Sequence, residues 1–375
     1  MPNRRGFCYK PTMTEPEPLQ QVDRTCVRQG RRKLTYFSGC DYFRLASHPV
    51  VLRAAHDGLN KFGLNVSASR MTTGNHDIYP TLETALADFF DAENALLLSS
   101  GYLTSLVTAQ AVAGEFSHTF IDAHAHAALL DAATWLGCPV VKFKHRDPSD
   151  LAKSLARFGS GIRPIVLTDG MFSHDGSVAP LKAYLKLLPA DGLILVDDAH
   201  GAGVLGETGR GSLEAEGVSR KRVVQCITLS KAFGAYGGAV VATRALRKKI
   251  FARSRLFMGS TPLPLPLACA ALQAVKILHA DKSLRRRLTQ NTGYVKASLQ
   301  TAGLNLPPAP GPIVPLHFEK PAAAAALKQR LLAAKIFPPF IQYPGGPANG
   351  YFRFVLSSEH TRVQLDQLLD VLTHA

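Results

Sequence analysis

Seven short apolar segments, most of them separated by stretches with helical periodicity, constrain the fold of this 375-residue chain more than any other feature. They are NALLLSS, HTFIDA, PVVKFK, RPIVLTD, GLILVDD, RVVQCITLS and GGAVVATR, and they fall between residues 94 and 244. Each is short enough for a strand, and their apolar character is continuous where a half-exposed strand would alternate. This pattern predicts an α/β fold with a mostly parallel sheet that helices cover on both faces.

The order of segments predicts an N-terminal arm and two domains. Residues 1–45 are rich in proline and charge at their start and contain a short strand pattern, KLTYFSG. Residues 46–280 carry the seven apolar segments and form the predicted large domain. A long helix that starts near residue 262 leads to a smaller α+β domain, residues 281–375, which contains the strand GYFRFVLS and a closing amphipathic helix.

The composition excludes several classes of protein. With 46% hydrophobic and 19% charged residues, the chain has the composition of a globular protein and not of a disordered or fibrous one. Its apolar runs, such as GLILV, are far too short to cross a bilayer, and the first residues lack the apolar segment of a secretion signal. Six cysteines without a C-x-x-C pair favour reduced thiols. We therefore expect a cytoplasmic protein without a membrane partner.

The formal net charge of +15 is the unusual bulk property. The basic residues form short clusters at 31–33, 220–222, 247–249 and 285–287. Such clusters are typical of solvated helix ends and loops, but they also attract polyanions, either phosphorylated small molecules or nucleic acid. Charge alone leaves both interpretations open.

Ligands of parallel sheets bind at the carboxyl ends of the strands, so these ends hold the candidate functional residues. The segment GLILVDD ends in Asp197 and Asp198, with His200 close behind. A P-loop ATPase is excluded because no lysine follows a glycine, and GAGVLG matches the dinucleotide fingerprint only weakly. A third interpretation is that the Asp197 carboxylate keeps a pyridine nitrogen protonated, which makes the ring an electron sink.

Lys231 follows the next apolar segment, in TLSKAFGAYGG, with glycines around it. Its amine is placed to form a Schiff base with an aldehyde cofactor; the alternative is a lysine that reaches solvent at a helix start. The stretch SSGY at 99–102 places free N–H groups and hydroxyls at a helix N-terminus, which is either an anion site or a capped turn. Thr228 would add a hydroxyl to that anion site.

Asp122, His124 and His126 alternate in FIDAHAHAALLDAA. This pattern is similar to the opening metal-binding motif of amidohydrolases, but only His200 is placed to complete such a set. The other interpretations are a structural histidine and an aromatic lid over a flat cofactor. We prefer the lid, and we expect no metal.

Several motifs, taken in order, resemble the α-oxoamine synthase family of pyridoxal 5′-phosphate (PLP) enzymes. They are SASRMTTGN, LLLSSGYLTS, DAHAHAALLDA, TDGMFSHDGSVAPL, VDDAHGAGVLGETGRG, TLSKAFGAYGG and FRFVLSSEH, and the similarity covers nearly the whole chain. The resemblance implies the PLP-dependent transferase fold of type I (aspartate aminotransferase-like). It also implies a homodimer with the active site at the interface.

The resemblance further implies a role for each candidate residue. Lys231 binds the cofactor covalently and removes the α-proton, while Asp197 pairs with the pyridinium nitrogen and His126 stacks on the ring. His200 and Ser173 hydrogen-bond the phenolic oxygen. The phosphate is held by Gly101, Tyr102 and Thr228, with Ser260 or Thr261 completing the phosphate site of the other subunit. Arg353 binds the amino-acid carboxylate.

The implied reaction joins a small amino acid to an acyl-CoA and releases CoA and carbon dioxide, so the basic clusters would attract CoA phosphates. Four positions depart from the family pattern: Cys40 replaces an asparagine, Arg44 a glycine, Tyr79 a histidine and Gln342 an arginine. Arg44 and Tyr79 are candidates for reshaping the acyl pocket. Two other classes stay open, a metal-dependent hydrolase and a polyanion-binding protein on a retired PLP scaffold. We expect no nucleic-acid partner.

Overall fold

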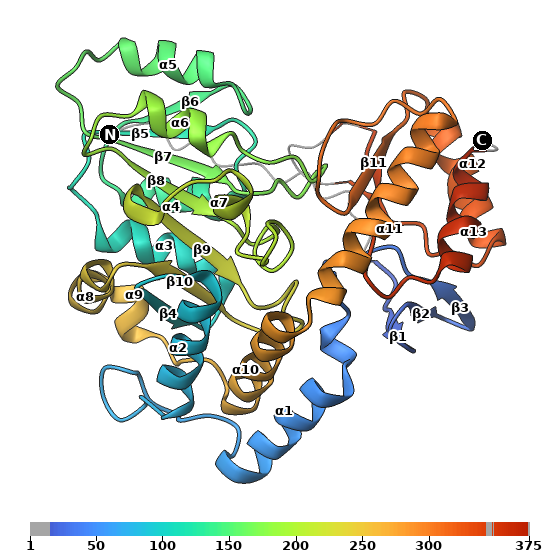
Figure 1. Cartoon of the computed structure of the whole chain (residues 1–375), viewed down its shortest axis with the longest axis horizontal. Coiled ribbons are helices and arrows are strands. Elements are labelled where there is room, and N and C mark those ends of the chain that lie inside the picture. The colour runs from blue at the N-terminus through green and yellow to red at the C-terminus, as the bar shows by residue number, and fades with distance from the viewer. Residues whose placement is uncertain (1–15, 343–346, 348, 374–375) are drawn as a thin grey trace.

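The computed structural model describes residues 16–342, 347 and 349–373. Figure 1 shows a sheet-centred large part and a smaller part, joined by the long helices α10 (Leu265–Ala280) and α11 (Lys282–Thr301). The predicted boundaries at residues 45 and 280 stay a prediction, although α10 ends at the second of them.

All seven predicted strands belong to one seven-stranded sheet with the order β4-β10-β9-β8-β7-β5-β6. The strands are β4 (Asn94–Leu98), β5 (His118–Asp122), β6 (Val140–Phe143), β7 (Pro164–Asp169), β8 (Leu193–Asp197), β9 (Val223–Thr228) and β10 (Gly238–Ala242). The pairs from β9 through to β6 are parallel, and only β10 runs antiparallel to its two neighbours. The predicted mostly parallel sheet is therefore confirmed.

Helices cover both faces of this sheet, which explains why its strands are apolar without interruption. Ile165 and Leu167 of β7 pack into the core on one face, while Val166 between them packs into the core on the other face. The helices of the large part are α1 (Pro49–Phe62), α2 (Ile78–Phe90), α3 (Gly101–Ala111), α4 (Ala127–Trp135), α5 (Pro148–Ala156), α6 (Leu181–Leu187), α7 (Ser212–Ala215), α8 (Arg244–Arg253) and α9 (Arg255–Gly259). Two short 3₁₀ helices cover Leu45–Ser47 and Arg220–Arg222.

The smaller part is built on an antiparallel sheet with the order β11-β13-β12. Its strands are β11 (Ile313–His317), β12 (Phe340–Ile341) and β13 (Tyr351–Val355), and helices α12 (Pro321–Ala333) and α13 (Arg362–Thr373) pack beside them. Phe352 and Phe354 of β13 enter a core shared with Leu327, Leu368 and Val295. Arg353, which lies between Phe352 and Phe354, is therefore on the other face of β13 and is directed away from this core.

The described section of the predicted arm forms a small antiparallel sheet of β1 (Gln20–Gln21), β2 (Cys26–Gln29) and β3 (Arg32–Thr35), which lies beside α13 in Figure 1. The Thr35 N–H donates to the Lys335 carbonyl at 2.7 Å, and Phe37 enters the core of the smaller part. In the part of the chain that the structure describes, no helix is long and apolar enough to cross a membrane.

A buried ion pair ties the large part together. Both carboxylate oxygens of Glu83 on α2 accept hydrogen bonds from the Arg70 guanidinium, and Arg247 of α8 lies 2.9 Å from Glu83 Oε2. The Leu97 N–H of β4 also donates to Glu83, at 2.9 Å. The side chains of Arg70 and Glu83 are only 4% and 6% exposed, so neither charge is compensated by water.

We predict that Glu83→Gln lowers the free energy of unfolding by about 3–5 kcal/mol, because it leaves the buried Arg70 guanidinium without its counter-charge. Urea unfolding measures this loss. Lys33→Gln is the matched control, since the Lys33–Asp23 pair is exposed to solvent and its loss should have little effect on stability. Equal losses in the two variants would contradict a structural role for the Glu83 pair.

Candidate active site

Lys231 and His200 meet at the carboxyl ends of two adjacent parallel strands. His200 follows β8 and Lys231 follows β9, and the Lys231 Nζ lies 2.7 Å from His200 Nε2. Burial lowers the pKa of Lys231, and the nearby Cys40 and Asp197 partly offset this effect. Burial also holds the pKa of His200 well below its usual range, and the Lys231 charge adds to that effect. Both groups are therefore shifted toward their neutral forms.

The glycines around Lys231 allow backbone segments to approach one another closely. A Cβ on Gly234, which has φ +59°, would lie 2.3 Å from the Ala46 amide nitrogen. A Cβ on Gly238 would lie 2.6 Å from Gly101 Cα. The turn that carries Lys231 is thus packed between the 45–46 segment and the start of α3.

Asp197 and Asp198 are neighbours in sequence but serve different parts of the structure. Asp197 Oδ1 accepts from the Ala199 N–H at 3.1 Å, and its Oδ2 lies 4.0 Å from His126 Nδ1. Asp198 accepts hydrogen bonds from the Ser212 N–H at 2.9 Å and from Gln225 Nε2 at 2.6 Å. Of these two acids, Asp197 is the one that contacts His126 and raises the pKa of Lys231.

Asp169, at the end of β7, is a buried carboxyl group that the sequence analysis missed. It lies opposite Asp197 in the parallel register, and its Oδ2 accepts from the His126 N–H at 2.8 Å. Burial and the neighbouring Asp197 hold the pKa of Asp169 well above its usual range. The signal that could have found it is the segment RPIVLTD, which ends in an acid on the strand adjacent to Asp197.

His126 caps α4 and presents its ring beside Tyr102. Its Nδ1 accepts from the Ala128 N–H at 3.2 Å, and 44% of its side chain is exposed. The Tyr102 ring meets it edge-on at 6.1 Å, and the Tyr102 hydroxyl donates to Asp131 at 2.5 Å. The His126 ring therefore has an open face near Asp197.

The start of α3 lies against Thr228. A Cβ on Gly101 would lie 2.6 Å from Thr228 Cβ, so this contact requires glycine. Ser100 caps the helix by accepting from the Tyr102 N–H at 3.2 Å. The Thr228 hydroxyl donates to the Gly237 carbonyl at 3.1 Å and accepts from the Ser230 N–H. The 11-residue helix α3 thus directs its N-terminus, where anions are stabilised, at the end of β9.

The contacts of three further predicted residues do not connect them to Lys231. They are Ser173, Ser260 and Thr261. Ser173 is half-buried in the segment after β7. The Ser260 hydroxyl donates to the Leu256 carbonyl, and Thr261 is exposed. Among the described residues, no hydrogen bond joins any of the three to Lys231, and the role of Ser260 or Thr261 in a partner subunit stays a prediction.

Arg353 reaches the site from the smaller part. Its Nη2 lies 2.9 Å from Cys40 Sγ. Next to Cys40, the Tyr42 hydroxyl lies 2.7 Å from His200 Nδ1, a contact that the sequence analysis also missed. Asp41 holds this turn by accepting hydrogen bonds from the Leu45 and Ala46 N–H groups.

The structure explains one departure from the family pattern. Arg44 adopts φ +52°, a left-handed conformation that glycine adopts without strain, which accounts for the usual glycine. Its guanidinium donates to the Tyr36 carbonyl at 2.9 Å and lies over the Tyr36 ring. Tyr79 is fully buried and donates to the Leu263 carbonyl at 2.6 Å, while Gln342 is exposed. Arg44 and Tyr79 thus bond to backbone carbonyls, and their effect on an acyl pocket stays a prediction.

The residues of the metal interpretation make other contacts. Asp122 accepts hydrogen bonds from the backbone of His124 and Arg146 and lies 2.9 Å from His145 Nδ1. His124 stacks on His145 with ring centroids 4.2 Å apart. No group of three or more His, Cys, Asp or Glu side chains in the described residues is arranged to hold a metal ion.

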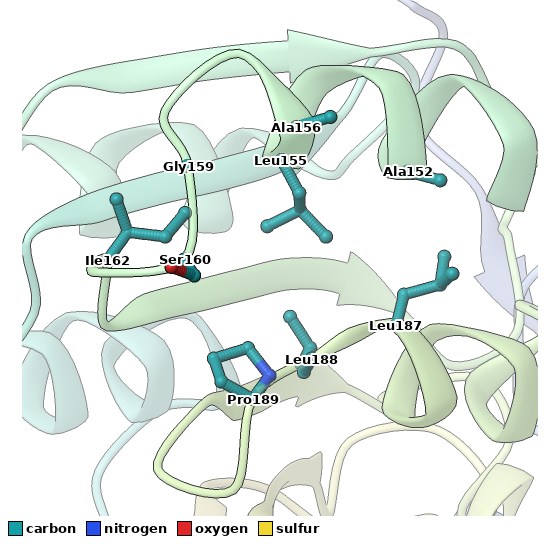
Figure 2. Close-up of a pocket in the computed structure, with 9 residues that line it drawn as sticks. All are labelled: Ala152, Leu155, Ala156, Gly159, Ser160, Ile162, Leu187, Leu188 and Pro189. Carbon is teal, nitrogen blue, oxygen red and sulfur yellow. The ribbon is translucent and has the colours of Figure 1, made fainter.

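Three cavities lie outside this cluster. Figure 2 shows one of about 450 Å³ beside α5, and its lining, which includes Leu155, Ile162 and Leu188, has no titratable side chain. A second, of about 530 Å³, has a lining that includes His174, Asp175 and His317 together with polar and apolar side chains of the smaller part. A third, of about 500 Å³, borders the basic residues 31–33. None of these three linings includes Lys231, His200 or Asp197. The candidate site is therefore the cluster at the strand ends.

Comparisons with known proteins found a family model, curated relatives and solved structures that match nearly the whole chain. A model of the family described as aminotransferase class I and II matches residues 37–372. The 8-amino-7-oxononanoate synthase of Thioalkalivibrio sulfidiphilus is 37% identical over 95% of this chain and 90% of its own. The 8-amino-7-oxononanoate synthase 1 of Bacillus subtilis is 30% identical over 96% and 93%.

Three of the similar solved structures are two serine palmitoyltransferases and one 8-amino-7-oxononanoate synthase. Sphingomonas wittichii serine palmitoyltransferase superimposes with a TM-score of 0.89 at 27% identity, covering 96% of this chain and 92% of its own. The 8-amino-7-oxononanoate synthase of Francisella tularensis gives 0.78 at 27% identity, covering 91% and 97%. A serine palmitoyltransferase from S. paucimobilis that contains bound PLP gives 0.90.

The buried Asp198 predicts a pH dependence of stability. Burial raises the pKa of Asp198 to about 7, so the folded chain holds a proton there that the unfolded chain releases near pH 4. Its contribution to stability is therefore complete below about pH 4 and is lost as the pH rises through 7. Relative to Asp198→Asn, the native chain should lose on the order of 4 kcal/mol over this interval in urea unfolding. Parallel pH profiles of the two proteins would contradict this prediction.

Proposed function

The chain belongs to the class I and II aminotransferase family, and from this membership we propose that it is a PLP-dependent acyltransferase that acts as an 8-amino-7-oxononanoate synthase. Its substrates are then alanine and a pimeloyl thioester, and its products include CoA or another free thiol and carbon dioxide. The support is the similarity to curated 8-amino-7-oxononanoate synthases at 30–37% identity over nearly the whole chain.

Two related activities are the alternatives. Glycine C-acetyltransferase is the first, because the segment TDGMFSHDG, residues 168–176, fits that enzyme well. An α-oxoamine synthase with another acyl donor is the second, and the likeness to serine palmitoyltransferase supports keeping it. The substitutions at Cys40, Arg44, Tyr79 and Gln342 bear on this choice.

The observation that carries the proposal is the Lys231 amine, partly buried and 2.7 Å from His200 at the strand ends. The surroundings fit PLP. Lys231 offers an amine to the aldehyde, Asp197 a carboxylate to the ring nitrogen, and the start of α3 against Thr228 a place for the phosphate. When bound, PLP supplies an electron sink for negative charge at the α-carbon of the amino acid.

The residues of this chain supply the remaining chemistry. The Lys231 Nζ, with its lowered pKa, takes the α-proton of the amino acid and returns it. The Asp197 carboxylate keeps the ring nitrogen protonated by its charge. The His126 imidazole would cover the PLP ring. Asp169 fixes the backbone of His126 by accepting a hydrogen bond from its N–H. His200 and Ser173 donate to the ring oxygen.

Arg353 binds the amino-acid carboxylate. Its guanidinium is partly buried on the strand face opposite the core of the smaller part, and its Nη2 has the Cys40 sulfur, a weak acceptor, as a partner. A carboxylate is the stronger acceptor, because a planar fork of donors binds it with two charge-assisted hydrogen bonds. Arg353 therefore selects amino acids and orients the α-carbon toward Lys231.

The protein acts as a homodimer in which Ser260 or Thr261 reaches the phosphate of the partner's site, and its basic surface attracts the phosphates of acyl-CoA. A cytoplasmic location stays a prediction. The two other classes have less support. Asp122 bonds to His145 and to backbone, which disfavours a hydrolase metal centre, and an intact Lys231–His200–Asp197 cluster disfavours a retired scaffold.

The first test is Lys231→Ala. We predict that the native protein, incubated with PLP, acquires a visible absorption band that borohydride abolishes, and that the variant acquires neither the band nor acyltransferase activity. Lys276→Ala is the control, because Lys276 is exposed on α10. A metal-dependent hydrolase and a polyanion-binding protein both predict no band in any of the three proteins, and that result would refute the proposal.

The second test is a substrate panel of glycine, alanine and serine with short and dicarboxylic acyl-CoA donors. Release of the free thiol measures turnover. We predict the highest kcat/KM for alanine with the pimeloyl donor. A preference for glycine with a short donor would assign the chain to glycine C-acetyltransferase and contradict the 8-amino-7-oxononanoate synthase assignment, but it would leave the PLP chemistry intact.

A further inference from the structure

We propose that Tyr42 is a positioning residue that keeps the single proton of His200 on Nε2, the nitrogen that faces Lys231. The His200 ring has one close partner at each nitrogen. Its Nδ1 lies 2.7 Å from the Tyr42 hydroxyl, and its Nε2 lies 2.7 Å from the Lys231 Nζ. The partner of one ring nitrogen decides which nitrogen of a neutral histidine carries the proton.

The direction of the Tyr42–His200 bond follows from the other contacts of the tyrosine. The Arg353 guanidinium lies close enough to lower the pKa of Tyr42, and a guanidinium only donates, so it offers no acceptor for the tyrosine proton. The tyrosine proton is then free to be donated. Cys40 also contacts the hydroxyl, but sulfur is a weak acceptor beside an imidazole nitrogen at 2.7 Å. The tyrosine therefore donates to Nδ1.

The protonation states of the two groups agree with this direction. Burial holds the pKa of Tyr42 well above its usual range, and burial also holds the pKa of His200 well below its own. Tyr42 keeps its proton and His200 has only one. The Arg353 charge also disfavours a second proton on His200, and so does Lys231 whenever its amine is charged.

The position of the His200 proton determines the direction of the hydrogen bond between His200 and Lys231. If Nδ1 accepts from Tyr42, Nε2 carries the proton and donates toward the Lys231 Nζ, which then acts as an acceptor in its neutral form. A neutral amine is the form that attacks an aldehyde. This inference rests on the proposed function in one respect: the same N–H becomes the donor that His200 offers to the PLP ring oxygen.

Two side chains therefore connect the carboxylate-binding group to the lysine. The order is Arg353, Tyr42, His200 and Lys231, and the first two positions come from opposite ends of the chain. The close packing of residues 45–46 against Gly234 brings the Tyr42 turn to this place. His200 is thereby held between the substrate-binding arginine and the reactive amine.

The test uses the PLP-loaded full chain labelled with ¹⁵N-histidine, and ¹H–¹⁵N NMR reads which nitrogen of His200 carries the proton. Comparison with His200→Gln identifies the signal. We expect the proton on Nε2 in the native protein and a mixture of both tautomers in Tyr42→Phe. Tyr184→Phe, which removes another buried hydroxyl in the large part, should leave the native pattern unchanged.

Activity supplies a second readout. We expect kcat to fall about tenfold in Tyr42→Phe, the equivalent of one buried hydrogen bond, and to stay near the native value in Tyr184→Phe. A proton on Nδ1 in the native protein would overturn the proposal without any variant. An unchanged tautomer in Tyr42→Phe would also overturn it. Absence of the visible PLP band would instead refute the proposed function, and the tautomer measured in PLP-free protein would still decide the role of Tyr42.

Discussion

The partly buried Lys231 amine at the carboxyl edge of the sheet is the constraint on which the site depends. Removal of a lysine from water disfavours its charged form, and the surrounding groups determine how far. Asp197 and Asp169 favour the charged amine, whereas burial and Arg353 oppose it. The neighbouring Asp169 has its own pKa raised, so only one of the two acids needs to carry a charge beside the lysine. This balance yields an amine shifted toward its nucleophilic form.

The sheet and helices of the large part hold Lys231 and the two acids close together. Parallel pairing of β7, β8 and β9 places Asp169, Asp197 and Lys231 at one edge, since equivalent ends of parallel strands lie together. Helices on both faces remove water from the sheet, and the buried Glu83 network joins α2, β4 and α8 behind it. The smaller part then contributes Arg353 from the face of β13 that lies opposite the core of the smaller part.

Much of this arrangement could be predicted from the sequence, because the signals are local. Continuous apolar strands predict a sheet covered on both faces, and each strand end marks candidate residues. Lys231, Asp197 and His200 were found in this way, and they meet in the structure. Asp169 was missed although it ends a strand, because nothing in the local sequence distinguishes its carboxyl group from an ordinary acid after a strand. Tyr42 was missed because no spacing rule connects residues 158 positions apart.

The sequence by itself determined the strands, the helices and the set of polar residues at the strand ends, since these follow from hydrophobic periodicity over a few residues. Only the tertiary structure decided that Asp169 lies opposite Asp197 beside the lysine, because the pairing of β7 with β8 joins residues that are far apart in the sequence. It also decided that Tyr42 meets His200 and that Arg353 meets Cys40. These two contacts depend on how the arm and the smaller part pack against the sheet, and such packing is a property of the whole chain.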